Sequence, residues 1–228
     1  MTPPPEPTAA DWRTGANRSP RRRNEILRRL HEAYPEASLA LRFQTPFELL
    51  CAAMLAAQST DASVNRVTPE LFRRWPDALA LARADETDVA DAIRSVNYYR
   101  TKAARLVAAS RVLVAEHDGR VPSSRDALEA LPGVGRKTAT LVANHAFDLC
   151  AGIVVDTHVA RVGSRLDWAQ SADPAKMADE LEALIPRKEW RGLQVLLAAH
   201  GREVCRATKP KCPACPVRNR CYWPERTA

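Results

Sequence analysis

The chain has 228 residues, a mass of 25.2 kDa and a formal net charge of +7, and its 46% hydrophobic and 27% charged residues are an ordinary globular composition that argues against wholesale disorder. No apolar run approaches the roughly 20 residues of a membrane-spanning helix. The N-terminus also lacks the apolar stretch of a secretory signal, so we expect a cytoplasmic protein. In a reducing compartment its six cysteines favour metal binding over disulfides.

The positive charge comes almost entirely from arginine, since all but six of the 34 basic residues are Arg. The planar guanidinium makes bidentate contacts to phosphate. The excess therefore favours a nucleic-acid partner over an anionic membrane or solubility alone.

The first residues differ from the rest of the chain. Residues 1–19 contain Pro3, Pro4, Pro5 and Pro7 and show no hydrophobic periodicity, so we expect a disordered tail. From about residue 20 onward the pattern is helical. The arginines at 21–23 fit either a solvated helix start or a phosphate contact. A helix with one apolar face follows, with apolar residues at helical spacing: Phe47, Leu50, Cys51, Met54 and Leu55.

The remaining sequence predicts further helices and no sheet. A long helix near 98–117 stops at Gly119, and Ser123 with Asp126 has the capping-box spacing that opens a short helix. Later helices are expected at 136–147, 157–166, 174–184 and 187–200, the last closed by Gly201. Because the β-like run at 153–155 is too short for a sheet, the sequence predicts an all-α fold.

A turn with two glycines, Gly133 and Gly135, joins two of these helices. Glycine adopts positive φ and lets another backbone come close. The unpaired amides at the start of the second helix lie beside the positive end of its dipole, which predicts a phosphate cradle. Arg136 separates the last glycine from Lys137, which excludes a nucleotide P-loop. An αα-hairpin without a ligand is the alternative.

The string Leu-Pro-Gly-Val-Gly, with Thr-Ala after it, resembles the helix–hairpin–helix motif of DNA-binding proteins. The resemblance implies that the amides of Gly133, Val134 and Gly135 hold a DNA phosphate without reading sequence. Lys137 lies in the same positive region. Cationic neighbours, a helix N-terminus and partial desolvation favour a neutral amine, which can attack a carbonyl. By itself, however, the residue is more typical of a lysine that contacts phosphate or solvent.

Asp156 follows the apolar run at 153–155 and precedes a predicted helix. This position is typical of an N-cap. It is also compatible with catalysis, because a carboxylate in a partly dry cleft can assist proton transfer or stabilise a cationic, sugar-like transition state. His158 is interpreted as a structural histidine.

Four cysteines near the C-terminus, Cys205, Cys212, Cys215 and Cys221, have the spacing C-x6-C-x2-C-x5-C and indicate a metal site. Both zinc and a [4Fe–4S] cluster accept four thiolates, and the spacing alone does not choose between them. Basic residues around the thiolates could contact a phosphate backbone. We interpret Cys51 as a core residue and leave Cys150 open.

Lys137, Asp156 and His200-Gly201-Arg202 before the four cysteines occur in this order. Together they resemble the endonuclease III family of helix–hairpin–helix DNA glycosylases, over about residues 20–223. The resemblance implies a two-lobed all-α protein with a helical barrel domain at 39–149. Residues 20–38 and 150–228 would form a second domain whose four cysteines hold a [4Fe–4S] cluster.

The resemblance also implies a bifunctional glycosylase and AP lyase that acts, as a monomer, on duplex DNA with oxidised or ring-saturated pyrimidines or abasic sites. Lys137 would attack the sugar C1′ of a flipped nucleotide, form a Schiff base and cleave the strand by β-elimination. Asp156 would assist proton transfer and stabilise positive charge. The source implied is a prokaryotic cytoplasm, with the protein associated with the nucleoid.

Further residues are placed by local match to the family. Gln58 would enter the gap left by the flipped base, and Asp61 would lie close to the DNA or cap a helix. Tyr98 falls where the family often has an aliphatic wedge. A tyrosine there could stack on bases, although it is bulkier and more polar.

Three other interpretations compete with this one. The adenine-mismatch branch of the superfamily shares the hairpin, the aspartate and the cluster, but it lacks the lysine and continues beyond the cluster into a recognition domain. A non-catalytic DNA-binding module would need no carboxylate such as Asp156 beside the cation. A zinc-stabilised scaffold protein would explain the four cysteines without iron.

Overall fold

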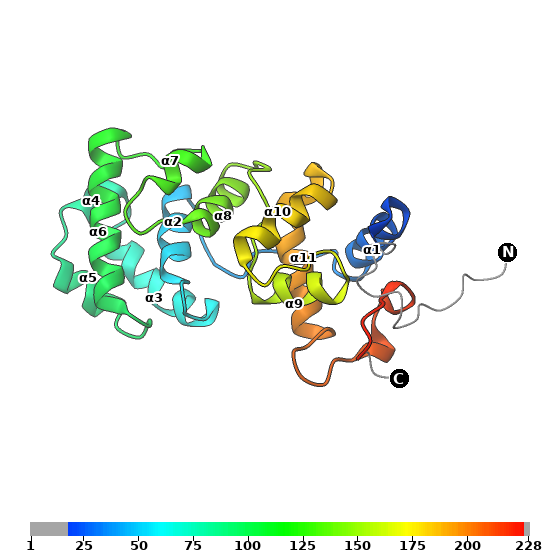
Figure 1. Cartoon of the computed structure of the whole chain (residues 1–228). Coiled ribbons are helices and arrows are strands. Elements are labelled where there is room, and N and C mark those ends of the chain that lie inside the picture. The colour runs from blue at the N-terminus through cyan, green and yellow to red at the C-terminus, as the bar shows by residue number, and fades with distance from the viewer. Residues whose placement is uncertain (1–17, 226–228) are drawn as a thin grey trace. The chain divides into compact units, whose positions relative to one another are not determined.

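A computed structural model describes residues 18–225 of the chain, and within that range it contains helices and no strand. The all-α prediction is confirmed. The described residues divide into two compact units, one formed by 39–151 and the other by 18–38 together with 152–225 (Figure 1). Among these residues no helix is both long and apolar enough to cross a membrane.

In the unit of residues 39–151, two helices each pack against two others. The long α6 packs against α4 and α5, and α8 packs against α2 and α7. The helices of this unit are α2 (Pro46–Leu55), α3 (Asp61–Arg74), α4 (Ala78–Ala82), α5 (Glu86–Ala92), α6 (Tyr99–Glu116), α7 (Arg125–Glu129) and α8 (Arg136–Ala146).

Two local predictions in this unit need correction. α2 was expected to bury one apolar face, but every residue from Leu49 to Leu55 is buried, because small alanines let neighbours pack on all sides. The short helix α7 is capped by Ser124 rather than Ser123, since the Ser124 hydroxyl accepts a hydrogen bond from the Ala127 amide at 3.2 Å. Cys51 is a core residue, as predicted.

The other unit packs four α-helices around a core that includes Ile26, Leu30, Trp168 and Leu197. Three short 3-10 helices complete it. Its elements are α1 (Pro20–Ala33), α9 (Thr157–Arg165), α10 (Pro174–Leu184), η3 (Arg187–Glu189), α11 (Trp190–Glu203), η4 (Cys212–Ala214) and η5 (Arg218–Arg220).

Gly201 does not close the last long helix, contrary to the sequence prediction. α11 continues through it to Glu203. A Cβ atom at Gly201 would lie 2.9 Å from Nδ1 of His158 on α9. The glycine is therefore explained by the close approach of α9 and α11.

The start of α1 also differs from the prediction. Arg22 is neither solvated nor available for phosphate, because it is buried and donates hydrogen bonds to the carbonyls of Leu166 and Arg220. Ser19, within the predicted tail, caps α1, and Arg18 donates to the carbonyl of Asp167 at 3.1 Å. The rest of that tail lies outside the described residues.

Candidate DNA-binding and catalytic site

The two glycines of the hairpin between α7 and α8 differ: Gly133 has the positive φ expected of a turn glycine, and Gly135 does not. Gly133 has φ +78°, and the Val134 amide donates to the carbonyl of Leu131 at 3.1 Å, so the Val134 amide is used within the turn. Gly135 is the N-cap of α8 in an extended conformation, and no side chain caps the helix. The N-cap residue of α8 therefore supplies no side-chain acceptor, and the helix start is suited to an external anion.

Lys137 occupies the second position of α8 and is exposed. Its ammonium group is thus carried by the first turn of a helix that already presents partial positive charge. The exposed lysine and the uncapped turn form one strongly positive feature of the 39–151 unit.

Asp156 is the N-cap of α9, as predicted. One carboxylate oxygen accepts hydrogen bonds from the amides of His158 and Val159, both at 2.8 Å, and the other lies 3.5 Å from Nε2 of Gln194. Asp156 belongs to the unit that contains 152–225, whereas Lys137 belongs to 39–151. His158 lies 3.1 Å from an Arg161 nitrogen, which agrees with a structural role.

Gln58 and Tyr98, which are 40 positions apart in the sequence, lie at linked positions in the 39–151 unit. The side chain of Asn97 donates a hydrogen bond to the carbonyl of Gln58 at 2.7 Å. Gln58 and Tyr98 are both exposed, Tyr98 to 66%, and both have left-handed backbone, with φ of 53° and 57°. The structure therefore links, through Asn97, the position that the family resemblance assigned to the gap of the flipped base and the position that it assigned to the wedge.

Asp61 does not cap its helix. Thr60 is the N-cap of α3, and its hydroxyl accepts a hydrogen bond from the Ser63 amide at 3.2 Å. Asp61 is the first residue of the helix, where a carboxylate is stabilised by the helix dipole.

Lys102 is a residue that the sequence analysis missed. It is buried on α6, and its ammonium donates to the carbonyl of Leu55 at 2.7 Å and to the hydroxyl of Ser59 at 2.9 Å. Burial lowers the pKa of this lysine. Its position four residues before Leu106, on the apolar face of the helix, was the signal that could have found it.

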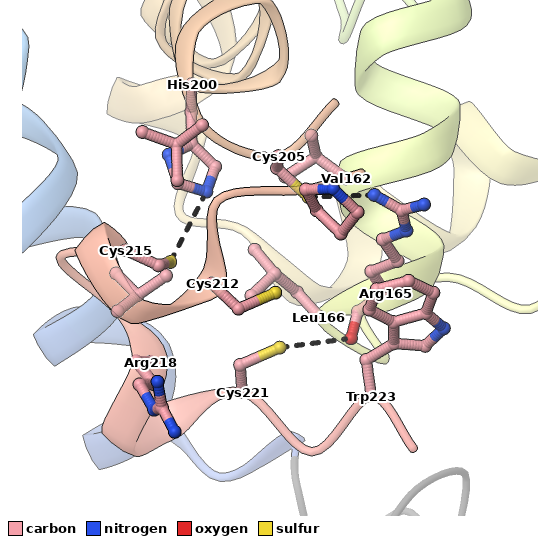
Figure 2. Close-up of a pocket in the computed structure, with 13 residues that line it drawn as sticks. Val162, Arg165, Leu166, His200, Cys205, Cys212, Cys215, Arg218, Cys221 and Trp223 are labelled. Carbon is pink, nitrogen blue, oxygen red and sulfur yellow. Dashed lines mark hydrogen bonds between the residues drawn. The ribbon is translucent and has the colours of Figure 1, made fainter. Parts of the chain in front are cut away.

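The four C-terminal cysteines line one small cavity that is partly open to solvent. Figure 2 shows them in a loop that runs past His200 of α11 and Arg165 of α9. Apart from Arg165, His200 and Arg218, the other lining residues are mainly apolar, including Val162, Leu166 and Trp223. Within residues 18–225 no group of three or more His, Cys, Asp or Glu residues that could hold a single metal ion is found.

The groups around the four sulfur atoms indicate which kind of metal group fits the cavity. Burial raises the pKa of Cys215 to about 12 and also raises that of Cys221, so these thiols need a bound cationic centre to become thiolates. An Arg165 nitrogen lies 3.4 Å from the sulfur of Cys205, and Nε2 of His200 lies 3.7 Å from that of Cys215. Four soft sulfur donors around an apolar cavity fit a thiophilic metal group.

The all-helical units and the hairpin with an uncapped second helix define a helix–hairpin–helix DNA-binding protein. In agreement, residues 51–187 match the description "HhH-GPD superfamily base excision DNA repair protein". Endonuclease III of Synechocystis is 44% identical over 88% of this chain and 91% of its own, and that of Escherichia coli is 38% identical over 90% and 97%.

Solved structures agree with these relatives. A trapped covalent intermediate of endonuclease III with DNA superposes with a TM-score of 0.83 at 36% identity, over 89% of this chain and 95% of the other. A non-covalent endonuclease III–DNA complex gives the same values. The chain belongs to the endonuclease III family, as its motifs predicted, and is a DNA glycosylase and AP lyase of base excision repair that binds double-stranded DNA.

Proposed function

We propose that the protein removes oxidised or ring-saturated pyrimidines from duplex DNA and cleaves the resulting abasic site by β-elimination, with Lys137 as the nucleophile. The observation that carries this proposal is an exposed lysine on the uncapped first turn of α8, in a chain whose relative forms a trapped covalent intermediate with DNA. A protein that only bound phosphate would need the turn, but it would form no covalent intermediate with DNA.

In the proposed reaction the neutral amine of Lys137 attacks C1′ of the flipped nucleotide, and the base leaves with the electron pair of its glycosidic bond. Loss of a proton and opening of the sugar ring give a Schiff base between Nζ and C1′. Removal of a C2′ proton then expels the 3′ phosphate. Asp156 assists proton transfer and stabilises the positive charge that develops on the sugar. The two amide donors on one of its oxygens hold its orientation.

The same proposal assigns the DNA contacts. The turn of Gly133, Val134 and Gly135 and the first turn of α8 bind a phosphate through amides other than that of Val134, which donates to Leu131. Gly135 suits this role because it adds no side chain and the space beside it is open. Gln58 fills the gap left by the flipped base, and Tyr98 stacks on a neighbouring base. Asp61 lies near the DNA.

We further propose that Cys205, Cys212, Cys215 and Cys221 hold a [4Fe–4S] cluster. The four cysteines line one largely apolar cavity, and four cysteine thiolates are the usual ligands of such a cluster, which supports the proposal. The cluster orders the loop of residues 205–221 and takes part in no step of base removal. Iron and sulfide analysis of the purified protein tests the assignment, and a colourless preparation that contains zinc contradicts it.

The curated relatives named above are bacterial. We accordingly place the protein in a prokaryotic cytoplasm, in association with the nucleoid.

Borohydride trapping on a duplex with one thymine glycol tests the proposed chemistry, with Lys137→Ala beside the unchanged protein. A covalent adduct that forms only with Lys137 present supports the nucleophile and the substrate together. Base release without an adduct contradicts the lyase step. DNA binding without release or adduct contradicts the proposed substrate.

A further inference from the structure

Four exposed residues of the 39–151 unit other than glycine have left-handed backbone; Asp118 and Asp148 are of a type that tolerates it, whereas the other two are not. Gln58 and Tyr98 both lie in the left-handed region, which residues other than glycine rarely occupy. Such conformations persist where the surrounding structure determines them, and they concentrate at functional sites. The question is therefore which groups hold these two residues in place.

Lys102 holds the segment that carries Gln58. Its ammonium bridges the carbonyl of Leu55, at the end of α2, and the hydroxyl of Ser59, directly after Gln58. A cation at the C-terminal end of a helix is stabilised by the helix dipole. Because Lys102 is buried, this bridge is shielded from water and leaves the segment 56–59 little freedom.

Asn97 links this segment to Tyr98. Its side-chain amide donates to the carbonyl of Gln58 at 2.7 Å, and the next residue along the chain is Tyr98. The backbone amide of Lys102 in turn donates to the carbonyl of Tyr98 at 3.0 Å. Lys102 and Asn97 thus connect both left-handed residues in one continuous set of hydrogen bonds.

We propose that Lys102 and Asn97 are positioning residues that hold Gln58 and Tyr98 as a preformed wedge, ready to occupy the duplex where a nucleotide has been flipped out. The inference rests on the DNA-contacting roles proposed above for Gln58 and Tyr98. A wedge that is ordered before binding loses less conformational entropy when it enters the base stack, and the duplex is then opened at lower cost.

The test measures binding and base unstacking without any chemistry. The duplex carries a stable tetrahydrofuran abasic analogue, with 2-aminopurine as the opposite base, so that unstacking raises fluorescence. We expect Lys102→Met to weaken binding about tenfold, which corresponds to about 1.4 kcal/mol, and to lower the fluorescence increase at saturation. Asn97→Asp places a carboxylate against the Gln58 carbonyl and is expected to act in the same direction.

A double-mutant comparison separates positioning from a general structural effect. If Lys102 acts through the wedge, Lys102→Met causes little further loss in a protein that already carries Gln58→Ala and Tyr98→Ala. Lys176→Met, at an exposed lysine of α10, is the matched control for loss of one positive charge and is expected to keep the full fluorescence increase.

Two results overturn the proposal. One is an equal loss from Lys102→Met with and without the wedge side chains, and the other is an unchanged fluorescence increase in both Lys102→Met and Asn97→Asp. If Lys102→Met does not fold, Ser59→Ala and Asn97→Asp decide by the same criteria. Failure of the protein to release thymine glycol contradicts the proposed function but not this inference, since the abasic analogue requires no base release.

Discussion

The starts of α8 and α9 differ in how they satisfy their unpaired amides. Glycine is the N-cap of α8, so the N-cap residue has no side chain that could accept from the first turn. Asp156 is the N-cap of α9, and one of its oxygens accepts from two amides at 2.8 Å. Both helices present the same partial positive charge. One start is left open for an anion from outside, and the other already contains an anion of the protein.

This difference between the helix starts accounts for the placement of the two proposed catalytic residues, Lys137 in the first turn of α8 and Asp156 at the N-cap of α9. At the open start, a lysine at the second position adds charge next to the phosphate that is proposed to bind there. At the closed start, the backbone fixes the orientation of the carboxylate that is proposed to act on the sugar. A helix start can therefore serve either to bind a substrate anion or to position a catalytic one.

The largest expected effect comes from Asp156, because capping and catalysis can be separated there. Asparagine caps helices about as well as aspartate, so we expect Asp156→Asn to keep stability within about 0.5 kcal/mol. Base release under single-turnover conditions should slow about 10²-fold to 10³-fold, since the proton-transfer group is lost. Asp156→Ala should add a stability loss of about 1 kcal/mol. Full activity of the Asp156→Asn variant would show that Asp156 only caps α9 and takes no part in catalysis.

A side-chain cap at the start of α8 should remove the difference between the starts of α8 and α9. A side chain fits at Gly135, because a Cβ there meets nothing within 4 Å and φ is −102°. We expect Gly135→Asp to stabilise the protein by a few tenths of a kcal/mol and to weaken DNA binding about tenfold or more by repelling the phosphate. The neutral cap Gly135→Asn is the control and should bind better than Gly135→Asp. Equal binding by the two variants would mean that no phosphate approaches this turn.

The other hairpin glycine should affect stability. Gly133 has φ +78°, and a Cβ there would lie 2.8 Å from Cδ of Arg105. We expect Gly133→Ala to lower the free energy of unfolding by about 1–2 kcal/mol for the backbone conformation, plus the cost of moving Arg105. Gly119→Ala is the matched control, with φ +72° and no atom within 4 Å. In denaturant unfolding, a Gly133 loss no larger than that of Gly119 would show that the contact with Arg105 costs nothing.

The smallest effect is expected for a carboxylate with a purely structural role. A hydrogen bond from Arg220, together with Arg29, holds the pKa of Glu25 below its ordinary value and ties η5 to α1. A lowered pKa stabilises the fold above about pH 4.5 and loses that contribution as the pH falls through the folded value. We expect Glu25→Gln to cost less than about 1 kcal/mol at pH 7 and nothing in strong acid. A difference in the free energy of unfolding between Glu25→Gln and the unchanged protein that persists in strong acid would contradict an ionic origin of the stabilisation.

Local sequence signals predicted the helices and the hairpin well because each depends on a few neighbouring residues. The cap at Asp156 follows from a carboxylate directly before a helix, and the turn at Gly133 from two glycines one residue apart. Signals that depend on distant contacts failed. Arg22 looked like a surface residue, but its partners Leu166 and Arg220 are more than 140 positions away. Gly201 looked like a helix end because its neighbour His158 lies on another helix.

The sequence by itself determined the helical fold class, the family and the positions of Lys137, Asp156 and the four cysteines, because these depend on residue type and spacing along the chain. Only the tertiary structure decided that Asn97 joins Gln58 to Tyr98 and that Lys102 is buried and bonded to Leu55 and Ser59. It also decided that the four cysteines share a cavity with His200 and Arg165. Hydrogen bonds between distant segments form only when packing brings donor and acceptor within about 3 Å, and no pattern along the chain encodes that distance.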